Sequence, residues 1–179
     1  MRKLVESTFV TLDGVIGDPQ VWGMSYWDAE HNEYARRLLF SADALLLGRK
    51  TYEGFAQAWP ERAGSSDFAD RFNELPKYVA SRTLPAGEAE WNATVLAGDT
   101  AEAVAAVKEQ PGENLVKYGT GEFSQTLLEH KLVDEYHFWL FPEVVGDGDR
   151  LFDGFRTSLE LLDTTRFASG IVVLMYAPK

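Results

Sequence analysis

Three polar turns in this sequence carry residue types that bind phosphate groups. Each follows a short apolar run, and two of them lead into segments with helical spacing; the turns are Gly48-Arg49-Lys50-Thr51, Ser81-Arg82-Thr83 and Gly119-Thr120-Gly121. A glycine turn before a helix lets backbone N–H groups approach a phosphate closely, and arginine forks and hydroxyls suit a terminal phosphate. A dinucleotide with an additional 2′-phosphate would use all three turns.

Each turn also has a purely structural alternative. Residues 44–47 suit a strand that is buried on both faces of a parallel sheet, and Gly48 with Arg49 then forms only a basic turn on a solvated helix end. The turn at residues 119–121 lacks the full G-x-G-x-x-G spacing. A ligand site is favoured because all three turns follow apolar strands, and ligands bind at the carboxyl ends of strands in open parallel sheets.

The elements that position these turns alternate along the chain. Strands are expected at residues 3–12, 44–47, 77–80, 94–97, 114–118 and 133–145, and a closing hairpin at 158–167 and 170–176. Helices are expected at residues 29–39, 49–59, 68–75, 101–110 and 122–131. This order predicts an α/β fold with a mostly parallel sheet, helices on both faces and antiparallel strands at the C-terminal end. A single domain over residues 1–179 is expected.

The connecting segments are less regular. Residues 15–27 contain glycines, a proline and two tryptophans, and we expect a long loop over a cleft there. Residues 84–92 are expected to form an irregular link, and Thr100 to cap the helix that follows it. Leu151, Phe152 and Phe155 are expected to form an apolar docking segment.

The composition excludes several functional classes. The formal net charge of −11 argues against nucleic acid or an anionic membrane as the main partner, and no run approaches membrane-spanning length. The absence of cysteine excludes thiol nucleophiles and disulfides. The scattered residues His31, His130 and His137 share no metal-ligand spacing, so no catalytic metal is expected. A cytoplasmic location is the default expectation.

Four segments carry a family resemblance. The sequences FVTLDGVIG, LLLGRKTYEGF, PKYVASRTL and KYGTGEFSQTLLEHKLVDEYHFWLFPEVVGDGDRLF resemble the dihydrofolate reductase-like superfamily. They look most like the branch named for the C-terminal reductase domain of the bifunctional riboflavin-biosynthesis enzyme, RibD. The resemblance covers nearly the whole chain and implies a three-layer α/β/α sandwich, NADPH as hydride donor and a homodimer. This chain has no deaminase domain and no zinc motif, so the substrate does not transfer with the resemblance.

The resemblance also implies a set of cofactor-binding residues. The resemblance implies that Gly48, Arg49 and Thr51 contact the phosphates of NADPH. It implies that Ser81 and Arg82 lie near the adenosine 2′-phosphate. The remaining cofactor residues are those of the pyrophosphate turn and of the loop beside the nicotinamide: Gly119, Thr120, Gly121, Val15, Ile16 and Gly17.

The substrate side offers two acidic candidates. Asp28 follows Trp27 at about the place where dihydrofolate reductases carry the acidic residue that grips the pterin, and its alternative role is a helix N-cap. Asp13 in the L-D-G motif is the second catalytic candidate, and its alternative role is to bond the loop backbone. His31 lies one turn after Asp28, where it either points into the cleft or only packs.

Two functions therefore remain open. The first is an NADPH-dependent reductase that transfers a hydride to a small heterocyclic substrate, similar to 5-amino-6-(5-phosphoribosylamino)uracil reductase or to dihydrofolate reductase. The alternative is a non-catalytic small-molecule or nucleotide-binding protein on the same fold. A homodimer is compatible with either function, with Tyr136, Phe138, Leu140 and the closing hairpin as the apolar face.

Overall fold

The computed structural model describes residues 1–154 and 156–179. Phe155, expected in a docking segment, lies outside the described residues. The chain divides into two compact units. The first unit comprises Met1–Leu4 and Arg36–Tyr118, and the second comprises Val5–Ala35 and Gly119–Lys179. The expectation of a single domain stays a prediction.

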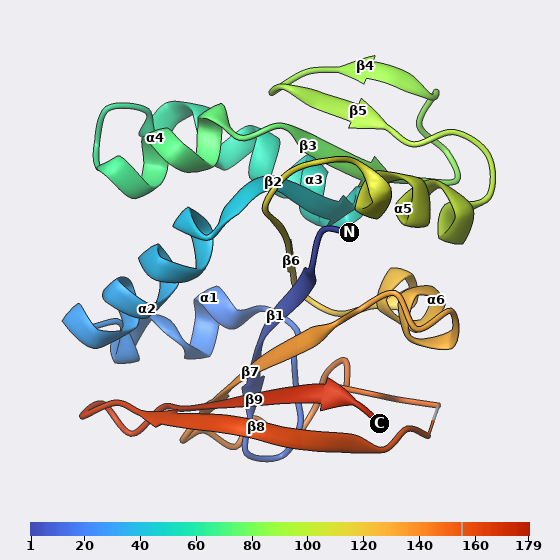
Figure 1. The fold of residues 1–179 in the computed structure, drawn as a ribbon. Coiled ribbons are helices and arrows are strands. Elements are labelled where there is room, and N and C mark those ends of the chain that lie inside the picture. Colours follow the sequence, from blue (N-terminus) through green and yellow to red (C-terminus); the bar gives the residue numbers. More distant parts are fainter. Residues whose placement is uncertain (155) are drawn as a thin grey trace. The chain divides into compact units, whose positions relative to one another are not determined.

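Strands and helices alternate along the chain and are labelled in Figure 1. The strands are β1 (Leu4–Thr11), β2 (Ala42–Gly48), β3 (Lys77–Ala80), β4 (Gly87–Ala89), β5 (Ala93–Val95), β6 (Asn114–Tyr118), β7 (Glu135–Phe141), β8 (Leu159–Arg166) and β9 (Val172–Pro178). The α-helices are α1 (Pro19–Trp22), α2 (Ala29–Phe40), α3 (Arg49–Ala58), α4 (Asp67–Glu74), α5 (Thr100–Glu109) and α6 (Glu122–Glu129). Short 3-10 helices lie at η1 (Met24–Tyr26) and η2 (Pro60–Arg62).

The strands of the first unit lie in the order β4-β5-β3-β2-β6. β2 pairs in parallel with β3 and with β6, and β3 pairs in parallel with β5. Leu45, Leu46 and Leu47 are fully buried, as expected for a strand covered on both faces of a parallel sheet. β4 runs antiparallel to β5, and both appear in green in Figure 1.

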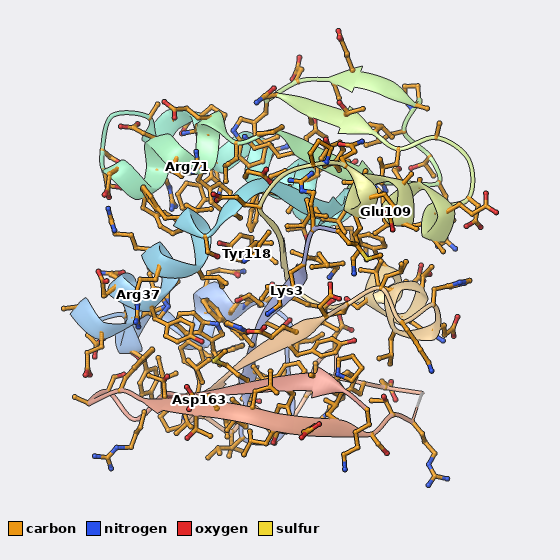
Figure 2. All side chains as sticks on the ribbon, in the orientation of Figure 1. Lys3, Arg37, Arg71, Glu109, Tyr118 and Asp163 are labelled. Atoms are coloured by element: carbon orange, nitrogen blue, oxygen red, sulfur yellow. The ribbon has the colours of Figure 1, made fainter. Side chains whose placement is uncertain are left out.

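Helix α4 is fixed within the first unit by polar contacts at both ends. The Ser66 hydroxyl accepts a hydrogen bond from the N–H of Ala69, which caps the helix. Arg71, labelled in Figure 2, donates from Nη2 to the carbonyl oxygen of Ala42 at 2.7 Å. The apolar side of the helix packs Phe72 against Trp59 in a stacked arrangement with 4.3 Å between ring centroids.

The strands of the second unit lie in the order β1-β7-β9-β8. β1 and β7 are parallel, whereas β9 runs antiparallel to both β7 and β8. The closing hairpin of β8 and β9, red in Figure 1, confirms the predicted antiparallel end of the chain. One cluster of its buried core comprises Tyr34, Trp139, Phe141, Phe167, Ile171 and Val173.

Three local expectations were wrong. The segment expected to be one long loop contains α1 and η1, because Trp22 packs edge-on against Phe141 and donates from Nε1 to the carbonyl of Gly17. The expected irregular link contains β4, which gains backbone pairing from β5. Helix α5 is capped by Asp99 rather than Thr100, since the Asp99 carboxylate accepts from the N–H of Glu102.

The apolar face expected for a dimer is partly used within the second unit. Tyr136 and Phe138 are buried and contact Phe152, so they are not available to a partner. By contrast, Leu161 and Leu162 on the edge strand β8 are about half exposed. None of the helices in the described part of the chain has the length and apolar character that a membrane crossing requires.

Candidate functional site

Two of the predicted phosphate-binding turns lie side by side in the first unit. Gly48 at the end of β2 is in register with Ala80 at the end of β3, and the two strands are parallel. Arg49 therefore starts its helix beside the point where Ser81 and Arg82 leave the sheet. The carboxyl edge of these two strands thus brings together the basic and hydroxyl side chains that the sequence predicted there.

The N-terminus of α3 offers unoccupied backbone donors to an anion. Gly48 is the N-cap and supplies no side-chain hydrogen bond, and the first turn contains no acidic residue. The first N–H groups of a helix have no intrahelical acceptor, and the helix dipole places partial positive charge at the same end. The end of α3 is therefore suited to a phosphate oxygen.

The side chains around these two turns are already partly engaged. Arg49 donates from Nη1 to both carboxylate oxygens of Glu53, at 2.9 and 3.1 Å, one turn along the same helix. The pair is about two-fifths exposed and therefore weakly held. The Ser81 hydroxyl accepts from the N–H groups of Thr83 and Leu84, which orders the turn. Arg49 can exchange its intrahelical partner for a phosphate, while Ser81 keeps the turn in shape.

The third turn opens α6 in the second unit. Gly119 adopts a φ of +74°, which favours glycine, and its N–H donates to the carbonyl of Ser7. Gly121 is the N-cap of α6, and a Cβ built on it meets no atom within 4 Å. The space beside Gly121 would let a bulky anion approach the backbone.

The hydroxyl of Thr120 makes hydrogen bonds to β1, and the cofactor-binding role of this residue stays a prediction. It donates to Oε1 of Glu6 at 2.9 Å and lies 2.6 Å from the hydroxyl oxygen of Thr8. Because its single proton goes to Glu6, Thr8 donates to it, and the hydroxyl has no further proton to give to a phosphate. Thr120 therefore ties the turn to β1, and the N–H groups of Gly119 and Gly121 also have partners, in the carbonyl of Ser7 and the hydroxyl of Ser124.

The loop at Val15, Ile16 and Gly17 is held by backbone contacts. Val15 exchanges hydrogen bonds with Thr11, through the backbone on one side and the Thr11 hydroxyl on the other. The N–H of Ile16 donates to the carbonyl of Asp149. Gly148 has a φ of +132° and approaches Val15 so closely that a Cβ would lie 2.9 Å from its side chain. Only glycine fits at position 148, and the loop is fixed as a result.

Asp13 anchors the same loop. Its carboxylate accepts from the Thr11 hydroxyl at 2.6 Å and from the N–H groups of Val145 and Gly146. The Thr11 hydrogen bond contributes most, followed by that from Gly146, and together they lower the pKa of Asp13 to about 2. Arg150 adds a hydrogen bond to the carbonyl of Asp13. This geometry favours the loop-bonding alternative for Asp13, because an ionised carboxylate does not donate a proton at neutral pH.

Asp28 caps helix α2. Its Oδ1 accepts from the N–H of His31 at 2.8 Å, and its carbonyl accepts from the N–H of Asn32. These are the contacts of an N-cap, the alternative role given for Asp28. Its assignment as a catalytic residue stays a prediction.

His31 is enclosed by aromatic rings. Its imidazole stacks on Trp27, with 4.9 Å between centroids and 15° between planes, and it also contacts Phe9 and Trp139. The residue is 4% exposed, and its Nε2 has no hydrogen-bond partner among the described residues. Desolvation lowers the pKa of His31, and the Asn32 hydrogen bond and the Asp28 charge oppose it. A buried polar atom without a partner costs roughly 1–3 kcal/mol.

His137 shows how the same unit satisfies a buried histidine. It is 6% exposed, yet Nδ1 lies 3.0 Å from the hydroxyl of Tyr34 and Nε2 lies 2.9 Å from Oε1 of Glu135. Both ring nitrogens therefore have partners. The contrast distinguishes His31 from the other buried histidine of the second unit.

Sequence reasoning missed several of these positioning residues. Glu6 was the clearest available signal, since it is a carboxylate inside an otherwise apolar and hydroxyl-bearing strand. Arg150, Phe9 and Trp139 carried no local signal, because their partners lie far away in the sequence. Among residues 1–154 and 156–179, no group of three or more histidine or acidic side chains is arranged to hold a metal ion. The expectation of no catalytic metal stays a prediction.

Comparison with known proteins identifies the family. The pattern of the RibD C-terminal domain matches residues 2–173. The chain is 28% identical to the uncharacterized protein YyaP of Bacillus subtilis (strain 168), over 98% of this chain and 94% of YyaP. It is 24% identical to the uncharacterized protein YwjB of the same organism, over 95% of each chain.

Solved structures show the same fold. A putative riboflavin biosynthesis protein from Shewanella sp. PV-4 aligns with a TM-score of 0.77 and 20% identity, over 99% of each chain. A pyrimidine reductase-like protein from Corynebacterium diphtheriae aligns with a TM-score of 0.63 and 15% identity, over 99% of this chain and 92% of that one.

A bifunctional enzyme contains the fold as one part. The diaminohydroxyphosphoribosylaminopyrimidine deaminase/5-amino-6-(5-phosphoribosylamino)uracil reductase from Thermotoga maritima aligns with a TM-score of 0.70 and 15% identity. The alignment covers 99% of this chain and 57% of that enzyme. These similarities confirm the predicted α/β fold class of the dihydrofolate reductase type.

Proposed function

Because the chain belongs to the RibD C-terminal domain family, we propose that it is an NADPH-dependent reductase that transfers a hydride to a small heterocyclic substrate. The observation that carries this proposal is the adjacency of two turns at the carboxyl edge of β2 and β3. The uncapped start of α3 and the arginines at positions 49 and 82 suit a phosphate monoester such as the 2′-phosphate of NADPH.

The residues divide the work of holding the cofactor. In the proposal, Gly48 and Thr51 meet phosphate oxygens, and Arg49 meets the 2′-phosphate together with Arg82, which lies on the turn shaped by Ser81. The pyrophosphate is proposed to lie beside Gly121, where a Cβ would meet no atom within 4 Å. The Thr120 hydroxyl and the N–H groups of Gly119 and Gly121 already have partners within the second unit. When bound, the cofactor supplies a hydride; the protein supplies its orientation and the surrounding charges.

The proposed substrate class is supported by the family and by the names of two structural relatives. The Thermotoga maritima enzyme is named as a reductase of a phosphoribosylamino-uracil, and the Corynebacterium diphtheriae protein as pyrimidine reductase-like. We propose a planar pyrimidine or pteridine-like heterocycle for this chain. A cytoplasmic location and a homodimer accompany the proposal.

The cofactor assignment is tested with variants of Arg49. Replacing it with alanine removes a charge-assisted contact worth about 1.5–3 kcal/mol, so NADPH affinity should fall by roughly tenfold or more while NADH affinity changes less. Glu53→Gln frees Arg49 from its intrahelical pair and should leave NADPH affinity equal or higher. Isothermal titration calorimetry measures both cofactors on each variant.

Arg166→Ala provides the matched control, since Arg166 is an exposed arginine on β8. Its cofactor affinities should equal those of the wild type. Equal losses of NADPH and NADH affinity in Arg49→Ala would remove the preference for the phosphorylated cofactor from the proposal.

A further inference from the structure

The atom Nε2 of His31 is a buried hydrogen-bonding group that the protein leaves unused. Among the described residues nothing bonds to it, although His137 in the same unit has a partner on each ring nitrogen. Buried polar atoms are satisfied in the great majority of cases, and an exception calls for an explanation, such as strain, a bound partner or a catalytic role. Packing alone does not explain the imidazole, because a phenyl ring would fill a cage of aromatic rings without leaving a nitrogen unbonded.

The surroundings of His31 are aromatic on several sides. We define the His31 cage as His31 with the rings of Phe9, Trp27 and Trp139, whose centroids lie 4.9–5.6 Å from the imidazole centroid. Aromatic faces bind planar heterocycles through stacking and edge contacts. The cage contains no cationic side chain, so it is suited to a neutral ring rather than to a phosphate.

Trp27 is the outermost ring of the cage. It is 42% exposed, whereas Trp139 is 1% exposed. It follows the 3-10 helix η1 and precedes the N-cap Asp28, so it lies in a connecting segment rather than inside a regular element. Trp27 can therefore turn away at a smaller loss of packing than either Phe9 or Trp139.

We infer that His31 is the residue that recognises the substrate heterocycle, and that Trp27 is the cover that moves to admit it. The ligand class is a neutral planar ring with neighbouring N–H and C=O groups, as in uracils and pterins. In a neutral imidazole, Nε2 either donates or accepts a hydrogen bond, depending on the tautomer. A ring edge with both an N–H and a C=O group can pair with either tautomer. The inference rests on the proposed reductase function, because only a reductase would use the heterocycle as its substrate. Binding of the heterocycle to His31 is measured without turnover.

The test uses 5,6-diaminouracil as the probe and the histidine side chains as reporters. The sequence contains three histidines, His31, His130 and His137, so the ¹⁵N spectrum of histidine-labelled protein is simple to assign with single variants. The probe should shift the Nε2 resonance of His31 and leave that of exposed His130 in place. An unmoved His31 resonance at saturating probe, or no binding at millimolar probe, would overturn the inference.

Variants separate recognition from folding. His31→Phe keeps a ring of similar size and removes the unbonded nitrogen, so it should fold at least as stably as the wild type. Its affinity for the probe should nevertheless fall by roughly tenfold, the equivalent of one hydrogen bond. His130→Gln is the matched control and should bind the probe as the wild type does. Unchanged probe affinity in His31→Phe contradicts the inference.

The cover is tested by chemical modification. Diethyl pyrocarbonate acylates accessible imidazole nitrogens, and wild-type His31 is nearly fully buried. Trp27→Leu should speed modification of His31, as mapped by mass spectrometry, and the probe should slow it again. Equal modification rates in the wild type and Trp27→Leu would remove Trp27 from the role of cover.

Parallel thermal-shift measurements with NADPH keep the two proposals distinguishable. Loss of probe binding in His31→Phe with normal NADPH stabilisation supports the inference. If NADPH stabilises none of the proteins, the proposed function fails, while the response of His31 to the probe still decides the inference.

Discussion

Asp13 shows how a candidate catalytic residue can hold a loop in place, and its catalytic role stays a prediction. The L-D-G motif placed a carboxylate near the expected nicotinamide loop, and the structure surrounds that carboxylate with the Thr11 hydroxyl and two backbone N–H groups. The L-D-G motif already allowed the alternative that the Asp13 side chain bonds the backbone of a turn. The donors at Val145 and Gly146 could not be predicted, because they come from a segment more than 130 residues away.

The lowered pKa of Asp13 makes its contribution to stability dependent on pH. The folded-state pKa is about 2, compared with an ordinary value of 3.8, so the contribution is complete above 3.8 and is lost as the pH falls toward 2. Asp13→Asn should lower the unfolding midpoint at neutral pH. Its difference from the wild type should shrink when both are measured near the folded-state pKa.

Asp153→Asn is the control for this comparison, since Asp153 is exposed. Urea unfolding at neutral pH and near the folded-state pKa of Asp13 measures the stability of the wild type, Asp13→Asn and Asp153→Asn. A deficit of Asp13→Asn that stays constant with pH would mean that the charge of Asp13 does not hold the loop.

At the scale of elements, periodicity located the long helices and strands but not the short ones. β2 and β6 have apolar runs that are readable in the sequence, and both form strands as predicted. α1 has four residues and β4 has three, so neither is long enough for a periodic pattern to repeat recognisably in the sequence. Both depend on distant partners: Trp22 packs on Phe141, and β4 pairs with β5.

Helix α5 offers a direct test of an element boundary. Asp99 caps the helix through the N–H of Glu102, whereas the sequence favoured Thr100 as the cap. Asp99→Ala should therefore lower the free energy of unfolding by about 0.5–2 kcal/mol. Thr100→Ala, the matched variant one residue later, should have a smaller effect. Urea denaturation ranks the two, and the reverse order would restore Thr100 as the cap.

At the scale of the whole molecule, the family resemblance and the α/β order were both available from sequence. The pattern of the RibD C-terminal domain over residues 2–173 and the fold similarity to the Shewanella sp. PV-4 protein confirm them. The candidate site was predicted less completely. The turns at Arg49 and Arg82 lie together as expected, but the His31 cage assembles rings from β1, α2 and β7 that no local motif connects.

The homodimer stays a prediction at this scale. β8 forms an edge of its sheet and exposes Leu161 and Leu162, whereas Tyr136 and Phe138 are buried. An edge strand with exposed leucines is a surface on which strands of another chain can pair. If the homodimer forms, β8 is therefore a more suitable contact than the buried face of β7.

The central claim, a site for a 2′-phosphorylated nicotinamide cofactor, is tested most directly by titrating the protein with NADPH, NADP⁺ and NADH and following the thermal unfolding midpoint. A ligand at about 100 times its Kd stabilises the folded state by roughly 2.7 kcal/mol, which is readily measured. We predict a clear rise in the midpoint with NADPH and NADP⁺ and a much smaller rise with NADH. No rise with any of the three at millimolar concentration would contradict the account.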